Sequence, residues 1–177
     1  MTTALLIIDV QEALCSGPYG AFDAPGVLQR INHVSGLARA AGALVVLIQH
    51  DAPGGVLAHG SAGWQLASGL VVQPSDVRLG KQATDSFHHT GLHALLRAHG
   101  TTQLVVCGLQ SEFCVDTTTR RAMALGYPVK LVADGHSTSN TAVLTAAQIS
   151  AHHNTTLANI TSFGPRTVAV PAAEVVF

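Results

Sequence analysis

Cys114 is the residue whose position in the chain most favours chemistry. It follows the apolar run Leu104–Cys107 and a short turn, and it stands at the predicted start of the next helix. The N–H groups at a helix N-terminus stabilise a thiolate, lower its pKa and can also bind an oxyanion. A buried cysteine that only fills a core is the more common role, and it is our interpretation of Cys107. For Cys114 the strand–turn–helix position favours a nucleophile with a lowered thiol pKa.

Asp9 and Lys81 are two charged residues that could assist such a nucleophile. Asp9 ends the apolar run Ala4–Ile8, where a carboxylate needs a partner or a task to offset the cost of burial. As a general base it could take the thiol proton and later return it to a leaving amine. Lys81 follows a short predicted strand, and its ammonium would hold a thiolate and a carboxylate in their charged forms. The alternatives are an aspartate that caps a loop and a solvated surface lysine.

The elements that must position these residues alternate along the chain. Apolar runs predict strands at 4–8, 44–48, 76–79, 104–107, 129–133 and 167–170. Helical patterns follow Asp23 and Thr90 and span Glu112–Leu125 and Thr141–His153. This alternation indicates an α/β protein whose parallel sheet is covered on both faces. Such sheets bind ligands outside the carboxyl ends of their strands, and the residues found there are Asp9, His50, Gly108–Cys114 and Asp134.

Composition narrows the class of protein. A chain of 177 residues with 47% hydrophobic and 11% charged residues favours one folded domain, and the low charge favours a homo-oligomer. The net charge of −1 and the absence of a basic stripe argue against a nucleic-acid partner. The N-terminal apolar run is too short for a membrane span and lacks a signal peptide's basic segment. The three cysteines have no paired spacing, so we expect a reducing compartment, the cytoplasm.

Four stretches together resemble one known family. They are Ala4–Gln11, Gly80–Lys81 with Asp85–Phe87, Val105–Val115 and Thr117–Gly126. Their order and spacing are similar to those of the isochorismatase-like hydrolases, which include nicotinamidases, carbamoyl-amide hydrolases and streptothricin hydrolases. The resemblance runs through nearly the whole chain, and it implies a single domain over residues 1–177.

The resemblance also implies a fold and a set of site residues. The fold would be a doubly wound, Rossmann-like sheet of about six parallel strands flanked by helices. An Asp-Lys-Cys triad would fall on Asp9, Lys81 and Cys114. The family often has a cis peptide bond before the nucleophile turn, here between Leu109 and Gln110. The backbone N–H groups of Gln110 and Cys114 would then form the oxyanion hole.

We expect no metal and no other cofactor. Nicotinamidase-type members of the family bind a metal through an Asp-x-His pair after the second strand. Here that strand ends in Gln49-His50-Asp51, in the wrong order, and His59 is the only other histidine nearby. A metal site needs at least three convergent ligands. His50 is therefore assigned to the pocket wall or to a loop hydrogen bond.

Four further residues are predicted to line the substrate pocket, although core or loop packing is the alternative for the aromatic ones: Trp64, Phe87, Gln110 and Phe113. Cys15, in a loop after the first strand, could border the site without a catalytic role.

The retained cysteine decides between the functional interpretations. Family members that act on isochorismate, a vinyl ether, lack it. We therefore expect a cysteine hydrolase that cleaves a C–N bond of a small-molecule amide, lactam, carbamate or ureide through a thioester. The alternatives are a vinyl-ether hydrolase and a non-catalytic binding or scaffold member, which would not need an intact triad. The family and the low charge suggest a homodimer or homotetramer.

Overall fold

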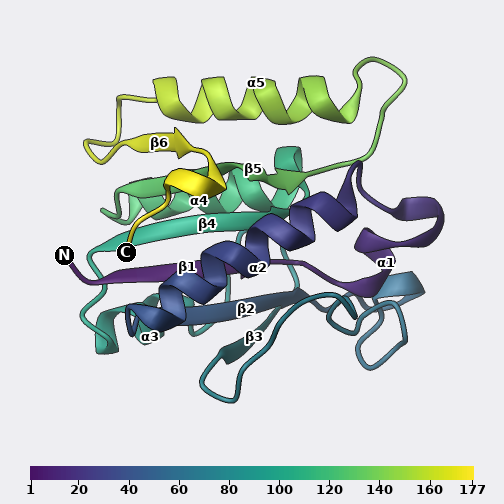
Figure 1. Ribbon diagram of the computed structural model, residues 1–177, viewed down its shortest axis with the longest axis horizontal. Helices are drawn as coiled ribbons and strands as arrows, with labels where there is room; N and C mark the ends of the chain where they lie inside the picture. Colours follow the sequence, from purple (N-terminus) through teal and green to yellow (C-terminus); the bar gives the residue numbers. More distant parts are fainter.

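The computed structural model describes residues 1–177 and contains one six-stranded sheet in the order β3-β2-β1-β4-β5-β6 (Figure 1). Every neighbouring pair of strands is parallel. The strands are β1 (Thr3–Ile8), β2 (Leu44–His50), β3 (Val77–Lys81), β4 (Gln103–Leu109), β5 (Val129–Ser137) and β6 (Thr167–Val170). This strand order is that of a doubly wound sheet, so the expected fold class is confirmed.

Helices connect most of the strands, and the sheet separates two core layers. They are α1 (Glu12–Cys15), α2 (Ala24–Ala40), α3 (Leu92–Ala98), α4 (Asp116–Ala124) and α5 (Ala146–Asn159). Side chains alternate across a strand, so β1 sends Leu6 and Ile8 to a core shared with α3, α4 and α5. Its residues Leu5 and Ile7 enter a second core, shared with α2 and the C-terminal segment. In Figure 1, α2 crosses the front of the sheet and α4 lies behind it.

The predicted boundaries of β5 and α5 were wrong. Strand β5 runs four residues past Ala133 to Ser137, and Asp134 therefore lies inside the strand, where its carboxylate accepts the Ala172 N–H at 2.7 Å. The helix predicted from Thr141 begins instead at Ala146. Thr145 caps it, because its hydroxyl accepts the Gln148 N–H while the Gln148 side chain accepts the Thr145 N–H.

The order in which strands are added to the sheet reverses between β1 and β4. Gly108 permits the close approach of these two strands at this switch point. Gly108 pairs with Ile8, the last residue of β1, and has a φ of +118°. A β-carbon at this position would overlap the carbonyl oxygen of Ile8. Because Asp9 follows Ile8 directly, this contact also sets the distance between Asp9 and the segment after β4.

No helix in the structure has both the length and the apolar character that a membrane crossing needs.

We predict that Gly108→Ala lowers the free energy of unfolding by about 2 kcal/mol or more, because it adds both a backbone overlap and a disfavoured φ. Gly36→Ala is the matched control. Gly36 lies in α2, and its added β-carbon would meet no atom within 4 Å. The control should be neutral or stabilising by up to about 1 kcal/mol. Urea unfolding of both variants tests this, and equal effects would contradict the packing argument.

Candidate active site

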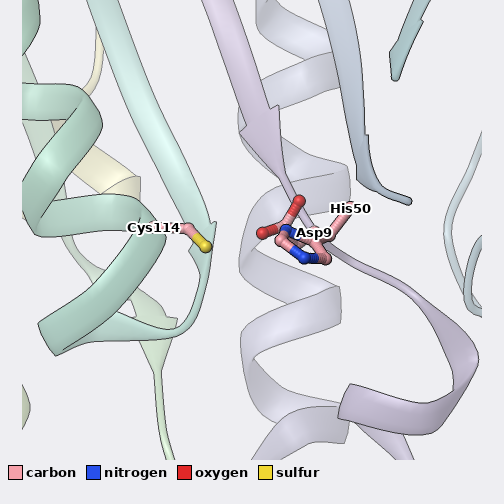
Figure 2. A group of neighbouring side chains, drawn as sticks. All are labelled: Asp9, His50 and Cys114. Atoms are coloured by element: carbon pink, nitrogen blue, oxygen red, sulfur yellow. The ribbon is translucent and has the colours of Figure 1, made fainter. Parts of the chain in front are cut away.

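All three triad residues lie at one edge of the sheet, the edge formed by the carboxyl ends of the strands. Asp9 follows β1 with a φ of 50°, and Lys81 is the last residue of β3. Cys114 lies in a π-helical turn, Ser111–Val115, which connects β4 to α4 and is called the nucleophile turn below. Parallel strands place their carboxyl ends at the same edge, and a ligand site opens there where the strand order reverses, between β1 and β4. Figure 2 shows the Cys114 sulfur pointing across this edge toward Asp9 and His50.

The ammonium of Lys81 connects the three side chains. Its Nζ lies 2.7 Å from Asp9 Oδ2 and 3.2 Å from Cys114 Sγ, and it also donates to the Ala83 carbonyl at 3.0 Å. Lys81 is 2% exposed and Asp9 1% exposed. A buried ammonium is tolerated only when it is paired and hydrogen-bonded, and these contacts meet that condition. The structure thus brings together the three residues that the sequence singled out for catalysis.

The expected lowering of the thiol pKa was wrong. Burial, together with the neighbouring Asp9 carboxylate, raises the pKa of Cys114 to about 12, against the opposing charge of Lys81. Burial also raises the pKa of Asp9, an effect that Lys81 opposes. The N-terminal position of the nucleophile turn does not outweigh desolvation. The raised pKa of Cys114 favours a neutral thiol in the resting site, and the Lys81 ammonium 2.7 Å from Asp9 favours a carboxylate there.

A proton can nevertheless move from Cys114 to Asp9 at little electrostatic cost. Loss of the thiol proton to solvent would add a negative charge to a buried site, which burial opposes. Transfer to Asp9 keeps the net charge of the three side chains unchanged, because Lys81 then pairs with a thiolate instead of a carboxylate. Asp9 Oδ1 is buried and has no hydrogen-bond partner, so it can accept this proton. The raised pKa of Asp9 makes the carboxylate a stronger base.

A cis peptide bond between Leu109 and Gln110, which the family resemblance implied, comes just before the nucleophile turn. The Gln110 carbonyl accepts the N–H groups of Phe113 and Val115 at 3.1 and 3.2 Å, which closes the turn around Cys114. The predicted oxyanion donors, the N–H groups of Gln110 and Cys114, stand at the two ends of this loop.

His50 lies beside the triad at the end of β2. Its Nδ1 is 3.2 Å from Lys81 Nζ, and its pKa is lowered by burial and by the charge of Lys81. A neutral ring that accepts from the ammonium fits both observations. Gln11, which sequence reasoning missed, fixes His50: its side chain bonds the His50 N–H and carbonyl as well as the Trp64 carbonyl. The available sequence signal was its place at the end of Ala4–Gln11, a stretch that carries the family resemblance.

The donor atoms of Asp9, His50 and Cys114 lie within 4.8 Å of one another, which is close enough for a metal site. However, the Lys81 ammonium contacts all three, and a metal ion would have to displace it. His59, the other histidine considered, bonds Asp51 at 3.2 Å instead. These residues do not fit the Asp-x-His metal site of nicotinamidase-type members.

A cavity of about 570 Å³ opens beside Lys81, and its size suits a small molecule. Its walls come mainly from the ends of β2 and β3 and the loop after β3, and the lining residues are Asp51, Gly80, Lys81, Gln82, Ala83, His88 and His89. Sequence reasoning missed Gln82, His88 and His89, because polar residues in a loop carry no periodic pattern.

The predicted pocket residues have different surroundings. Trp64 donates its indole N–H to Asp51, a residue of the cavity wall. Phe87 is buried in the same core cluster as Cys114 and stacks on Tyr127 at 6.4 Å, while Phe113 is 52% exposed next to the nucleophile. Their contacts with substrate stay predictions. Cys15 packs against the second core, on the sheet face opposite Cys114.

Comparison with known proteins places this geometry in a family. The isochorismatase domain model matches residues 3–164. The chain belongs to the isochorismatase family. A crystal structure of an isochorismatase family protein shares 34% sequence identity and a TM-score of 0.86, covering 95% of this chain and 97% of that one.

Curated relatives of this isochorismatase-family chain include named hydrolases. A streptothricin hydrolase from Streptomyces noursei is 46% identical over 136 residues, which cover 76% of this chain and 49% of that protein. The chain thus spans about half the length of the streptothricin hydrolases it matches. A ureidoacrylate amidohydrolase from Methylobacterium radiotolerans is 30% identical, in an alignment that covers 92% of this chain and 74% of that protein.

We predict that Asp9→Asn slows alkylation of Cys114 by iodoacetamide by about 100-fold or more, since the thiol loses its base. In the wild type the rate should fall as pH drops through the raised pKa of Asp9, above the ordinary aspartate value of about 4, because a protonated carboxyl cannot accept the proton. Above that limb the rate should be flat. Peptide mass spectrometry measures the Cys114 adduct. A rate that climbs tenfold per pH unit toward pH 8.5, unaffected by Asp9→Asn, would show an ordinary thiol.

We predict that Lys81→Met lowers the free energy of unfolding by about 3–5 kcal/mol, because the Asp9 carboxylate then remains buried without its partner. The double variant Asp9→Asn/Lys81→Met removes both charges and should recover much of that loss. Chemical denaturation of the single and double variants measures the coupling. Strictly additive losses would mean that the pair does not hold these strand ends together.

Proposed function

We propose that this protein is a cysteine-dependent amidohydrolase that cleaves a C–N bond of a small-molecule amide, lactam, carbamate or ureide. The observation that carries the proposal is the Lys81 ammonium, which contacts both the Asp9 carboxylate and the Cys114 sulfur in a site almost closed to water. This arrangement supplies a nucleophile, a base and a fixed positive charge within hydrogen-bond reach of one another.

The first half-reaction forms a thioester. Substrate binds beside Lys81 with its carbonyl carbon within reach of the Cys114 sulfur, which attacks while Asp9 takes the thiol proton. The carbonyl oxygen becomes an oxyanion, which the N–H groups of Gln110 and Cys114 stabilise. The C–N bond then breaks, and the proton on Asp9 passes to the leaving nitrogen as ammonia or an amine departs.

The second half-reaction regenerates the enzyme. Water attacks the thioester carbon and gives a proton to Asp9, and a second oxyanion forms in the same place. The C–S bond breaks, an acid is released, and Asp9 returns its proton to the Cys114 thiolate. Lys81 stays positive throughout. It pairs with Asp9 or Cys114 when either is the anion, and in the two tetrahedral intermediates the negative charge lies on the oxyanion.

Two observations support C–N cleavage over vinyl-ether hydrolysis. A cysteine lies 3.2 Å from the Lys81 ammonium, where the proposed nucleophile is needed, and vinyl-ether hydrolysis has no use for a thioester. The relative at 30% identity that covers most of this chain is named an amidohydrolase.

We predict that the wild-type protein hydrolyses at least one member of a panel of amides, lactams, carbamates and ureides that includes streptothricin and ureidoacrylate. Ammonia release and the gain of one water by mass spectrometry measure the reaction, the latter for ring opening. Cys114→Ala should lower turnover by about 10⁴-fold or more with little change in melting temperature, because it removes the covalent intermediate.

Cys15→Ala is the matched control, since Cys15 is a partly buried cysteine on the other core. It should keep wild-type turnover. Absence of hydrolysis across the panel would favour the scaffold interpretation, and turnover that survives Cys114→Ala would exclude the thioester mechanism.

A further inference from the structure

A buried polar cluster behind the nucleophile turn has no part in the reaction described above. Ser111 Oγ lies 2.7 Å from His136 Nδ1 and 2.9 Å from Ser150 Oγ. On the other side of the ring, His136 Nε2 lies 2.9 Å from Asn154 Oδ1. Ser111 is fully buried and His136 is 3% exposed. The cluster joins three segments: the turn that carries Cys114, the end of β5, and α5.

The direction of each hydrogen bond follows from one fixed acceptor. The Ala133 carbonyl can only accept, so the Asn154 amide nitrogen, 2.9 Å away, donates to it. Asn154 Oδ1 therefore faces His136, and Nε2 of the ring carries the hydrogen. In a neutral imidazole Nδ1 is then an acceptor, and the Ser111 hydroxyl donates to it. Burial lowers the pKa of His136, which agrees with a neutral ring.

The same two elements hold the nucleophile turn and the start of α4 at further points. The Thr138 hydroxyl, just past β5, donates to Glu112 at 2.8 Å. In α5, His153 Nδ1 lies 3.0 Å from the carboxylate of Asp116, which begins α4. Three side chains of the segment Ser150–Asn154 thus bond the nucleophile turn, His136 or the start of α4. His152 is exposed; its ring nitrogen bonds Thr156 within α5, and its ring lies edge-on against His153.

We propose that His136 is a positioning residue that fixes the nucleophile turn through Ser111, with α5 fixing His136 in turn. Ser111 lies directly between Gln110, the proposed oxyanion donor, and the residues leading to Cys114. An acceptor at the Nδ1 position locks the Ser111 rotamer and with it the path of the turn. This inference rests on Cys114 being the nucleophile of the proposed function.

Two substitutions separate this role from simple core filling. Asparagine at 136 can place an oxygen where Nδ1 lies and so keep the acceptor for Ser111. Glutamine at 136 can place its amide nitrogen where Nε2 lies and so keep the bond to Asn154 while losing the acceptor. His136→Gln should slow Cys114 alkylation by iodoacetamide about 10-fold or more, because the sulfur is no longer held against Asp9. His136→Asn should stay within about threefold of the wild type.

Ser111→Ala should reproduce the His136→Gln defect, and combining the two should add little, since both break one bond. With a substrate in hand, the defect should appear in kcat while KM changes less than about twofold. His152→Gln, at an exposed position of α5, is the control and should match the wild type in every measurement.

Equal alkylation defects in His136→Asn and His136→Gln, or defects that follow melting temperature alone, would overturn the proposal in favour of core packing. Wild-type alkylation in His136→Gln and Ser111→Ala would overturn it as well. Alkylation needs no amide turnover, so the test stands apart from the panel screen. A silent panel with a clear Asn–Gln difference would remove the proposed function and leave the positioning role intact.

Discussion

One buried positive charge organises the site. The Lys81 ammonium is withdrawn from water, and it is stable there only because Asp9, the Ala83 carbonyl, His50 and Cys114 surround it. Asp9 and Cys114 follow β1 and β4, the strands on either side of the point where the strand order reverses, and Lys81 lies in the edge strand β3. A change in the register of any of these strands would leave a buried charge without its partner. The pairing of the sheet and the geometry of the triad therefore depend on each other.

In the proposed mechanism the same charge allows a thiol that is neutral at rest to react. Burial raises the pKa of Cys114 to about 12, which protects the sulfur from adventitious reaction with solvent species. Asp9, whose own pKa is raised, can take the proton without changing the charge of the site. Ionisation is therefore tied to the approach of an electrophile, and the fold needs no standing thiolate.

The apolar runs predicted six strands because burial on both faces leaves a clear pattern in Ala4–Ile8 or Leu104–Cys107. The extension of β5 to Ser137 could not be read this way, since Asp134, Gly135 and His136 interrupt the apolar run. The start of α5 depended on the Thr145–Gln148 capping box, which competed with an equally plausible threonine at 141. The family resemblance, more than any single spacing, brought Lys81 into the triad.

Other features of the site depend on three-dimensional environment and leave no local signal. The direction of the Cys114 pKa shift is set by desolvation against two nearby charges, and a helix-start position alone predicted the opposite sign. The clamp that Gln11 forms on His50 spans 39 residues, and the bond from Ser111 to His136 spans 25. The cavity wall at Gln82, His88 and His89 is formed by a loop whose path the sequence does not fix.

The central claim is that the Cys114 proton resides on sulfur at neutral pH, next to an ionised Asp9 and a charged Lys81. Ultraviolet titration of thiolate absorbance, taken as the difference between wild type and Cys114→Ala, measures this directly. The account predicts no thiolate signal at pH 7. A full thiolate signal at pH 7 would contradict it, because Asp9 would then already hold the proton that it is meant to receive during attack.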